Sequence, residues 1–168
     1  NSAGTCGGVH TSSGTNLVIT ANRAPVCGGA YDSKLSDSLI VSNEAYVSSS
    51  YVSGSYGGIQ KGSYTNCLIA CNTALGQQRA GYCSAGGAGG KATLYSCVVS
   101  NNQADARGGG VSDCTLYDCI VIGNRSAFSV LYLNKNILYI GVINHNIYLF
   151  AFFSSAIVSD GCCDLIVK

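Results

Sequence analysis

Apolar side chains occupy every second position in a short segment that the chain repeats. Each copy ends in an asparagine, with an Ile or Val three residues before it and a small or apolar residue two positions earlier. Residues two apart lie on the same face of a β-strand, so we expect both positions to point inward. The first column is Ile19, Ile40, Ile69, Val99 and Val121, and the second is Leu17, Ser38, Cys67, Cys97 and Cys119.

The asparagines recur at spacings of 21, 21, 29, 30 and 22 residues, so the basic period is near 21 or 22. A glycine stands 15 residues before each asparagine from the second onward, as expected at a corner without room for a Cβ atom. Stacked coils would place these asparagines about 4.8 Å apart, where each amide can donate to one neighbour and accept from the other. The predicted ladder is Asn1, Asn22, Asn43, Asn72, Asn102, Asn124 and, in a degenerate copy, Asn146.

This period and the twofold alternation predict an all-β fold, namely a single-chain parallel β-helix (β-solenoid) with about 21–22 residues per coil and about six to seven coils. The absence of an apolar face at spacings of three and four argues against a helical solenoid. We expect regular coils over residues 1–127, and degenerate apolar coils or a cap or interface region over 128–168. If the repeat continues, Cys163 and Leu165 fall in the inward columns of its last coil.

Two insertions account for the long spacings, and both leave the same corner of the predicted solenoid. They are residues 46–55 and 75–85, and the first is composed of Tyr, Ser, Val and Gly. Tyrosine offers rigid amphipathic contact area and Ser and Gly offer adaptable hydrogen bonding, which is the chemistry of a binding loop. The candidate binding residues are Tyr46, Tyr51, Tyr56 and Tyr82.

The repeat motif resembles that of a known class of proteins. Gly7-Gly8-Val9 is followed by Ile19-Thr-Ala-Asn22, and Gly57-Gly58-Ile59 by Ile69-Ala-Cys-Asn72. These elements resemble the repeats of large secreted right-handed parallel β-helix proteins, and they are similar in plan to the GGA and FxxN repeats of chlamydial polymorphic outer-membrane proteins. The resemblance covers residues 1–127. It implies a right-handed coil and an adhesin or surface-structure role, and it supplies no catalytic residues.

Composition narrows the setting. Charged residues make up 10% of the chain with a net charge of +1, so we expect no nucleic-acid partner. Ten cysteines favour an oxidising environment, outside the cell or on its surface. Cys6 and Cys27 share a column in adjacent coils and are a candidate disulfide, while the inward cysteine column is either a stack of small buried side chains or contains a bridge. The apolar run Ile137–Val158 has the length of a membrane span, but Asn144-His-Asn146 at its centre argues against one.

No cluster of reactive groups is predicted, so we expect no catalytic residues, no metal site and no cofactor. Polysaccharide cleavage by a β-helix needs carboxylates on adjacent coils. Asp37 and Asp118 share a column but lie three coils apart, which is roughly 14 Å.

Two functions remain. The first is an extracellular structural β-solenoid that assembles end to end with copies of itself into a filament, or that serves as a surface or adhesin scaffold. The alternative is a carbohydrate-binding or polysaccharide-degrading β-helix protein that holds a glycan with the loops at 46–55 and 75–85.

Overall fold

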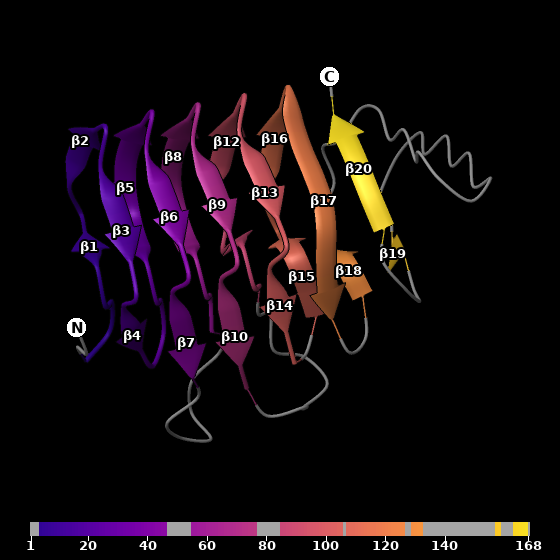
Figure 1. The fold of residues 1–168 in the computed structure, drawn as a ribbon, viewed down its shortest axis with the longest axis horizontal. Coiled ribbons are helices and arrows are strands. Elements are labelled where there is room, and N and C mark those ends of the chain that lie inside the picture. The colour runs from indigo at the N-terminus through magenta and orange to yellow at the C-terminus, as the bar shows by residue number, and fades with distance from the viewer. Residues whose placement is uncertain are drawn as a thin grey trace.

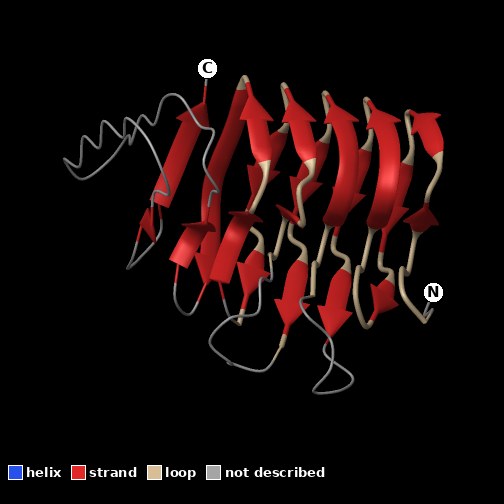
Figure 2. Cartoon of the chain, turned by 180° about the vertical axis from the view of Figure 1, so that it is seen from behind, coloured by secondary structure: helices blue, strands red, loops and turns tan. Residues whose placement is uncertain are grey.

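The computed structural model describes residues 4–46, 55–76, 85–105, 107–126, 129–132, 157–158 and 163–167, and within these ranges it is all-β, without a helix (Figures 1 and 2). The strands form two ten-stranded sheets. The first sheet contains β1 (Val9–His10), β2 (Ser13–Thr15), β5 (Ala30–Ser36), β8 (Ile59–Thr65), β11 (Ala88–Gly89), β12 (Thr93–Tyr95), β15 (Arg107–Ser112), β16 (Thr115–Tyr117), β18 (Ser129–Tyr132) and β19 (Ile157–Val158). The second contains β3 (Val18–Thr20), β4 (Arg23–Ala24), β6 (Leu39–Val41), β7 (Glu44–Tyr46), β9 (Leu68–Ala70), β10 (Thr73–Leu75), β13 (Val98–Ser100), β14 (Gln103–Ala104), β17 (Cys119–Ser126) and β20 (Cys163–Val167).

Equivalent strands of successive repeats lie side by side and run parallel, in agreement with a β-solenoid (Figure 1). The register is the one that the repeat predicts, because Ile19 pairs with Ile40, Ile40 with Ile69, Ile69 with Val99 and Val99 with Val121. The predicted all-β, parallel architecture is therefore confirmed. We use the word coil for one such repeat, for example Cys27 to Tyr46.

Corners divide each coil into straight segments of similar length. In the second coil they lie at Asp32, Asp37 and Ser42, which have φ angles of 45°, 49° and 55°. A positive φ is uncommon for a residue with a Cβ atom, and Asn and Asp tolerate it best. The same left-handed corners recur at equivalent positions of the other coils, although Thr, Lys, Ala and Cys also occupy them.

Between corners, side chains alternate between the interior and the solvent. Leu35, Ile40 and Ala45 are buried, whereas their neighbours Lys34 and Leu39 are exposed. Both predicted inward columns lie in the core, with Leu17 only partly buried, so the prediction of the inward face is confirmed. The interior is thus built from ladders in which each side chain contacts its equivalents above and below.

A pair of glycines brings neighbouring coils into close backbone contact. A Cβ atom added to Gly57 would lie 2.5 Å from the carbonyl oxygen of Gly86 and 2.7 Å from the backbone of Thr73. The fourth coil uses Gly86 and Gly87 here, because Gly58 stacks on Gly87. The glycine 15 residues before the asparagine is therefore not the equivalent one in this coil, which accommodates one extra residue between Gly89 and Thr93.

Both insertions lie at the same corner of the solenoid, because the residues before and after them pair with equivalent residues of the neighbouring coils. Arg23 pairs with Glu44 and Glu44 with Thr73 before the corner, and Cys27 bridges Tyr56 and Tyr56 bridges Ala85 after it. Ala85 therefore belongs to the coil, and so do Tyr46 and Leu75, which pair with each other in β7 and β10. The predicted insertions 46–55 and 75–85 are each too long by these residues. Most of both insertions lies outside the described residues.

The C-terminal strands do not continue the parallel stack. Strand β20 pairs with β17 in antiparallel orientation, with Val121 opposite Leu165 and Asn124 opposite Cys163 (Figure 1). Strand β19 is likewise antiparallel to β18. The predicted parallel coil through Cys163 and Leu165 is therefore wrong, since the direction of a strand cannot be read from residue spacing alone.

Candidate interaction surface

The asparagines form a continuous hydrogen-bonded column inside the solenoid. In each pair of coils, the backbone N–H and the Nδ2 of one asparagine both donate to the Oδ1 of the next, at 2.9–3.1 Å. The second Nδ2 hydrogen donates to a carbonyl oxygen of the preceding coil, for example from Asn72 to Ile40 at 2.8 Å. The described members are Asn22, Asn43, Asn72, Asn102 and Asn124. Asn1 and Asn146 lie outside the described residues.

Cys6 and Cys27 are adjacent in their column but are not joined. They form an isolated parallel bridge, and both thiols are free. Each sulfur is turned along its own coil, since the Cys6 Sγ donates to the Val9 carbonyl oxygen at 3.0 Å and the Cys27 Sγ to that of Ala30 at 3.0 Å. The expected disulfide is therefore absent from this structure.

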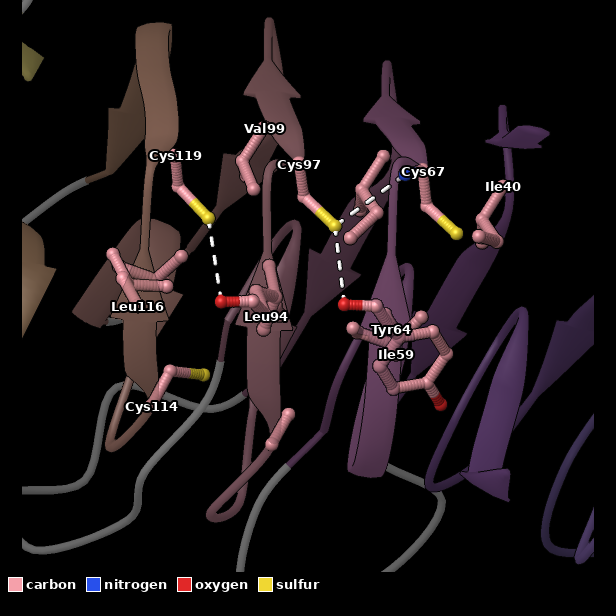
Figure 3. Packing of buried hydrophobic residues seen from close by; sticks show 14 of the residues in the cluster. Ile40, Ile59, Tyr64, Cys67, Leu94, Cys97, Val99, Cys114, Leu116 and Cys119 are labelled. Carbon is pink, nitrogen blue, oxygen red and sulfur yellow. Dashed lines mark hydrogen bonds between the residues drawn. The ribbon is translucent and has the colours of Figure 1, made fainter. Parts of the chain in front are cut away.

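The inward cysteine column is a stack of free, buried thiols (Figure 3). The Cys97 Sγ donates to the Tyr64 carbonyl oxygen at 3.5 Å and accepts a bond from the backbone N–H of Cys67 at 3.4 Å. The Cys119 Sγ donates to the Leu94 carbonyl oxygen at 3.5 Å. Contact with the neighbouring sulfurs of Cys119 and Cys67 raises the pKa of Cys97, so this thiol stays protonated. These cysteines act as small buried side chains rather than as a bridge.

The four candidate binding tyrosines are not equivalent. Tyr46 is half-buried, and the Arg23 guanidinium lies 4.2 Å from the centre of its ring. Tyr56 is only 5% exposed and belongs to the column that contains Cys27, which removes it from the binding loop. Tyr51 and Tyr82 lie outside the described residues.

The structure reveals an uncharged sheet surface that the candidate residues did not include. It is formed by the outward side chains of β3, β6, β9, β13 and the part of β17 that precedes Gly123, and we call it the apolar outer face. Its exposed large apolar members are Val18 (66%), Ile122 (43%), Leu39 (42%) and Ile120 (38%). Its two columns are Val18, Leu39, Leu68, Val98 and Ile120, and Thr20, Val41, Ala70, Ser100 and Ile122.

The two borders of the apolar outer face differ in charge. One border is a row of exposed corner residues that includes Asp37, which accepts a hydrogen bond from the Asn66 Nδ2 at 3.1 Å, and Asp118. Beyond the opposite corner, the outward positions include the exposed Arg23 and Arg125. Glu44 forms a salt bridge with Arg23 at 2.5 Å and raises its pKa.

Two tyrosines extend the exposed surface beyond the acidic border. Tyr95 and Tyr117 stack in adjacent coils with ring centres 4.8 Å apart, and 40% and 48% of their surfaces are exposed. Hydroxyl side chains, Thr93 and Thr115, stand two residues before them on the same side of the sheet.

A signal for the apolar outer face was present in the sequence. The position immediately before the inward Ile or Val is also apolar in every copy, so the segment is continuously apolar rather than strictly alternating. Parallel strands buried on both faces have this composition. This outward column is not among the predicted site residues.

Among the described residues there is no group of three or more His, Cys, Asp or Glu side chains able to hold a metal ion. In the same part of the chain, no helix is long and apolar enough to cross a membrane. Comparison of the chain with known protein families, with curated proteins and with solved structures finds no match.

Proposed function

We propose that the chain is a right-handed β-solenoid of about 21–22 residues per coil and about six to seven coils, which acts outside the cell as a structural or adhesin scaffold and assembles with copies of itself. The observation that carries this proposal is the apolar outer face, an uncharged surface with exposed large apolar side chains. Exposed contiguous apolar surface is typical of sites that contact another protein.

The internal ladders support a scaffold role. The asparagine column joins successive coils through buried hydrogen bonds, and the flanking Ile and Val column packs beside it. Such bonds are strong in a low-dielectric interior and polarise one another. A body of this kind holds its outer surface at fixed positions, which is what repeated contact with identical subunits requires.

A second copy is the partner that best fits the apolar outer face. Rotation by 180° about an axis along the stack places two such faces together, with the border of Asp37 and Asp118 on one copy near the border of Arg23 and Arg125 on the other. Five strands span about 20 Å at the usual strand spacing, so the contact is smaller than the roughly 800 Å² per partner of a standard interface. Association through it is accordingly weak and concentration-dependent.

End-to-end stacking is a second route to assembly. Strands β1, β2, β3 and β4 have a partner on one side only within the described residues, so their other edge can accept parallel strands. At the other end, the antiparallel β20 and β19 lie beside β17 and β18. A partner there would pair with these strands rather than extend the parallel stack.

The apolar outer face is tested by the double variant Leu39→Lys/Ile122→Lys. Both side chains are exposed, so the fold should persist, while two desolvated ammonium groups would weaken self-association at least about tenfold. Sedimentation velocity over a concentration series measures association, and electron microscopy shows its form. Thr65→Lys, an exposed position on the other sheet, serves as the control. A protein that is monomeric at every concentration would refute self-assembly, and a double variant that assembles normally would refute assembly through the apolar outer face.

Glycan binding remains the second candidate function, and the Tyr95–Tyr117 stack beside Thr93 and Thr115 favours it. Aromatic rings and hydroxyl groups together suit the apolar and polar faces of a sugar. Tyr117→Ala should then abolish binding on a glycan array while leaving assembly unchanged, whereas Tyr117→Phe should retain most of it. Equal binding by the wild-type protein and Tyr117→Ala would remove this candidate.

A further inference from the structure

Cys6 and Cys27 are held side by side by the backbone of two neighbouring coils. The Gly7 N–H donates to the Cys27 carbonyl oxygen and the Cys27 N–H to that of Thr5, both at 3.0 Å. In-register parallel strands lie about 4.8 Å apart, which is within the Cα separation that a disulfide accepts. The backbone therefore needs little movement for the two sulfurs to bond.

The two thiols differ in exposure. Cys6 is partly exposed, whereas Cys27 is completely buried. A soluble oxidant can therefore reach Cys6 but cannot reach Cys27 directly. The next residue of the column is the buried Tyr56, so among the described residues Cys6 is the cysteine neighbour of Cys27 in this column.

The pKa values of the two thiols differ as well, and Cys6 is again the more reactive of the two. A hydrogen bond from the Cys27 thiol, opposed by partial burial, lowers the pKa of Cys6 to about 7. Burial raises the pKa of Cys27 well above its ordinary value. In the neutral pair the Cys27 S–H donates to the Ala30 carbonyl oxygen, and it can turn to the Cys6 sulfur once that sulfur is ionised. Cys6 is thus the nucleophile, and Cys27 is protected until Cys6 has reacted.

We propose that Cys6 and Cys27 form a redox-active dithiol, which low-molecular-weight disulfides such as oxidised glutathione convert reversibly into an intramolecular disulfide. The Cys6 thiolate attacks one sulfur of glutathione disulfide, which forms a mixed disulfide and releases one glutathione thiolate. Cys27 then gives its proton to that thiolate and attacks the Cys6 sulfur, which releases the second glutathione as a thiolate that takes up the proton Cys6 had lost to solvent. Two protein thiols are oxidised and one glutathione disulfide is reduced to two glutathione thiols.

The product would join the coil that contains β1–β4 to the coil that contains β5–β7. The bond closes a loop with 20 residues between the two cysteines and fastens the strand edge at β1–β4 to the body of the solenoid. The inward column of Cys67, Cys97 and Cys119 is not a competing site, because these three side chains are at most 2% exposed and an oxidant has no access to them.

The test uses the reduced full-length protein, incubated with oxidised glutathione and then blocked with an alkylating reagent. Cleavage after Arg23 and Lys34 places Cys6 and Cys27 on separate peptides, so mass spectrometry without reductant identifies their cross-link. We expect this cross-link to be the main intramolecular product and to disappear with dithiothreitol. Its rate should rise about fivefold from pH 6 to pH 7 and level off above pH 8, as a thiol titrating near 7 requires.

Variants separate the two roles. Cys27→Ser should accumulate the mixed disulfide on Cys6, and Cys6→Ser should leave Cys27 unmodified, both with unchanged circular dichroism. Cys71→Ser removes an exposed thiol on another column and should not affect the cross-link. The proposal is overturned if folded protein does not form the cross-link, if Cys27 is modified in Cys6→Ser, or if the rate keeps rising to pH 9.

Discussion

Replacement of Asn102 by alanine is expected to lower the free energy of unfolding by about 3–5 kcal/mol. The side chain is 1% exposed and makes four hydrogen bonds, donating to the Ile69 carbonyl oxygen and the Asn124 Oδ1 and accepting two bonds from Asn72. Alanine would leave the Asn72 donors and the Ile69 carbonyl buried and without these partners. Urea-induced unfolding followed by circular dichroism measures the change.

The neighbouring Asn101 provides a matched control. It is exposed and has a φ of 53°, so Asn101→Gly removes an amide of the same type from outside the solenoid at a corner that glycine tolerates. Its expected effect is below about 1 kcal/mol. If the two substitutions destabilised the protein equally, the buried ladder could not be the reason for the loss.

Replacement of Tyr64 by alanine should cost a similar amount, about 3–5 kcal/mol, through the loss of core packing. Tyr64 is fully buried and lies beside Leu94 of the next coil (Figure 3). On its other side it pairs with Leu35 of the preceding coil. Backbone pairing fixes the spacing of these coils, so the neighbouring leucines cannot close the cavity. Chemical denaturation gives the free energy, and a solvatochromic dye reports whether the interior has loosened.

Tyr64→Phe isolates the hydroxyl group. Its oxygen is 3.5 Å from the Ala30 carbonyl oxygen, which is long for a hydrogen bond between two oxygens. We therefore expect Phe to retain nearly all of the stability, with a change under about 1 kcal/mol. A loss as large as that of the alanine variant would show that the hydroxyl, rather than the ring, holds the coils together.

The interior of the fold followed from the sequence because two constraints coincide there. Strand periodicity fixes which residues point inward, and the recurrence of Asn and Ile at a constant offset fixes which of them stack, as in the register of Ile40 with Ile69. Corners were harder to place, because Lys61 and Cys71 adopt the left-handed conformation although their residue types do not favour it. Stacking on Asp32 and Ser42 in the preceding coil imposes that conformation on them.

The candidate site was less predictable. Outward residues meet solvent, so packing within the chain does not restrict their identity. The apolar character of Leu39 and Ile120 was visible only as a second apolar position beside the inward one. The extra residue beyond Gly89 and the reversed direction of β20 also escaped prediction. Both depend on pairing with a distant strand, which a repeat alignment does not contain.

At the corner that contains both insertions, additional residues leave the arrangement of the coils unchanged. Two residues lie between Ala24 and Cys27, whereas ten lie between Ala45 and Tyr56, yet the columns on either side keep their register. Closing a longer flexible loop costs only about 0.6 kcal/mol for each doubling of its length. This corner is therefore a natural grafting point, where foreign peptides could be displayed on adjacent coils, one strand spacing apart, without altering the hydrogen-bonded interior.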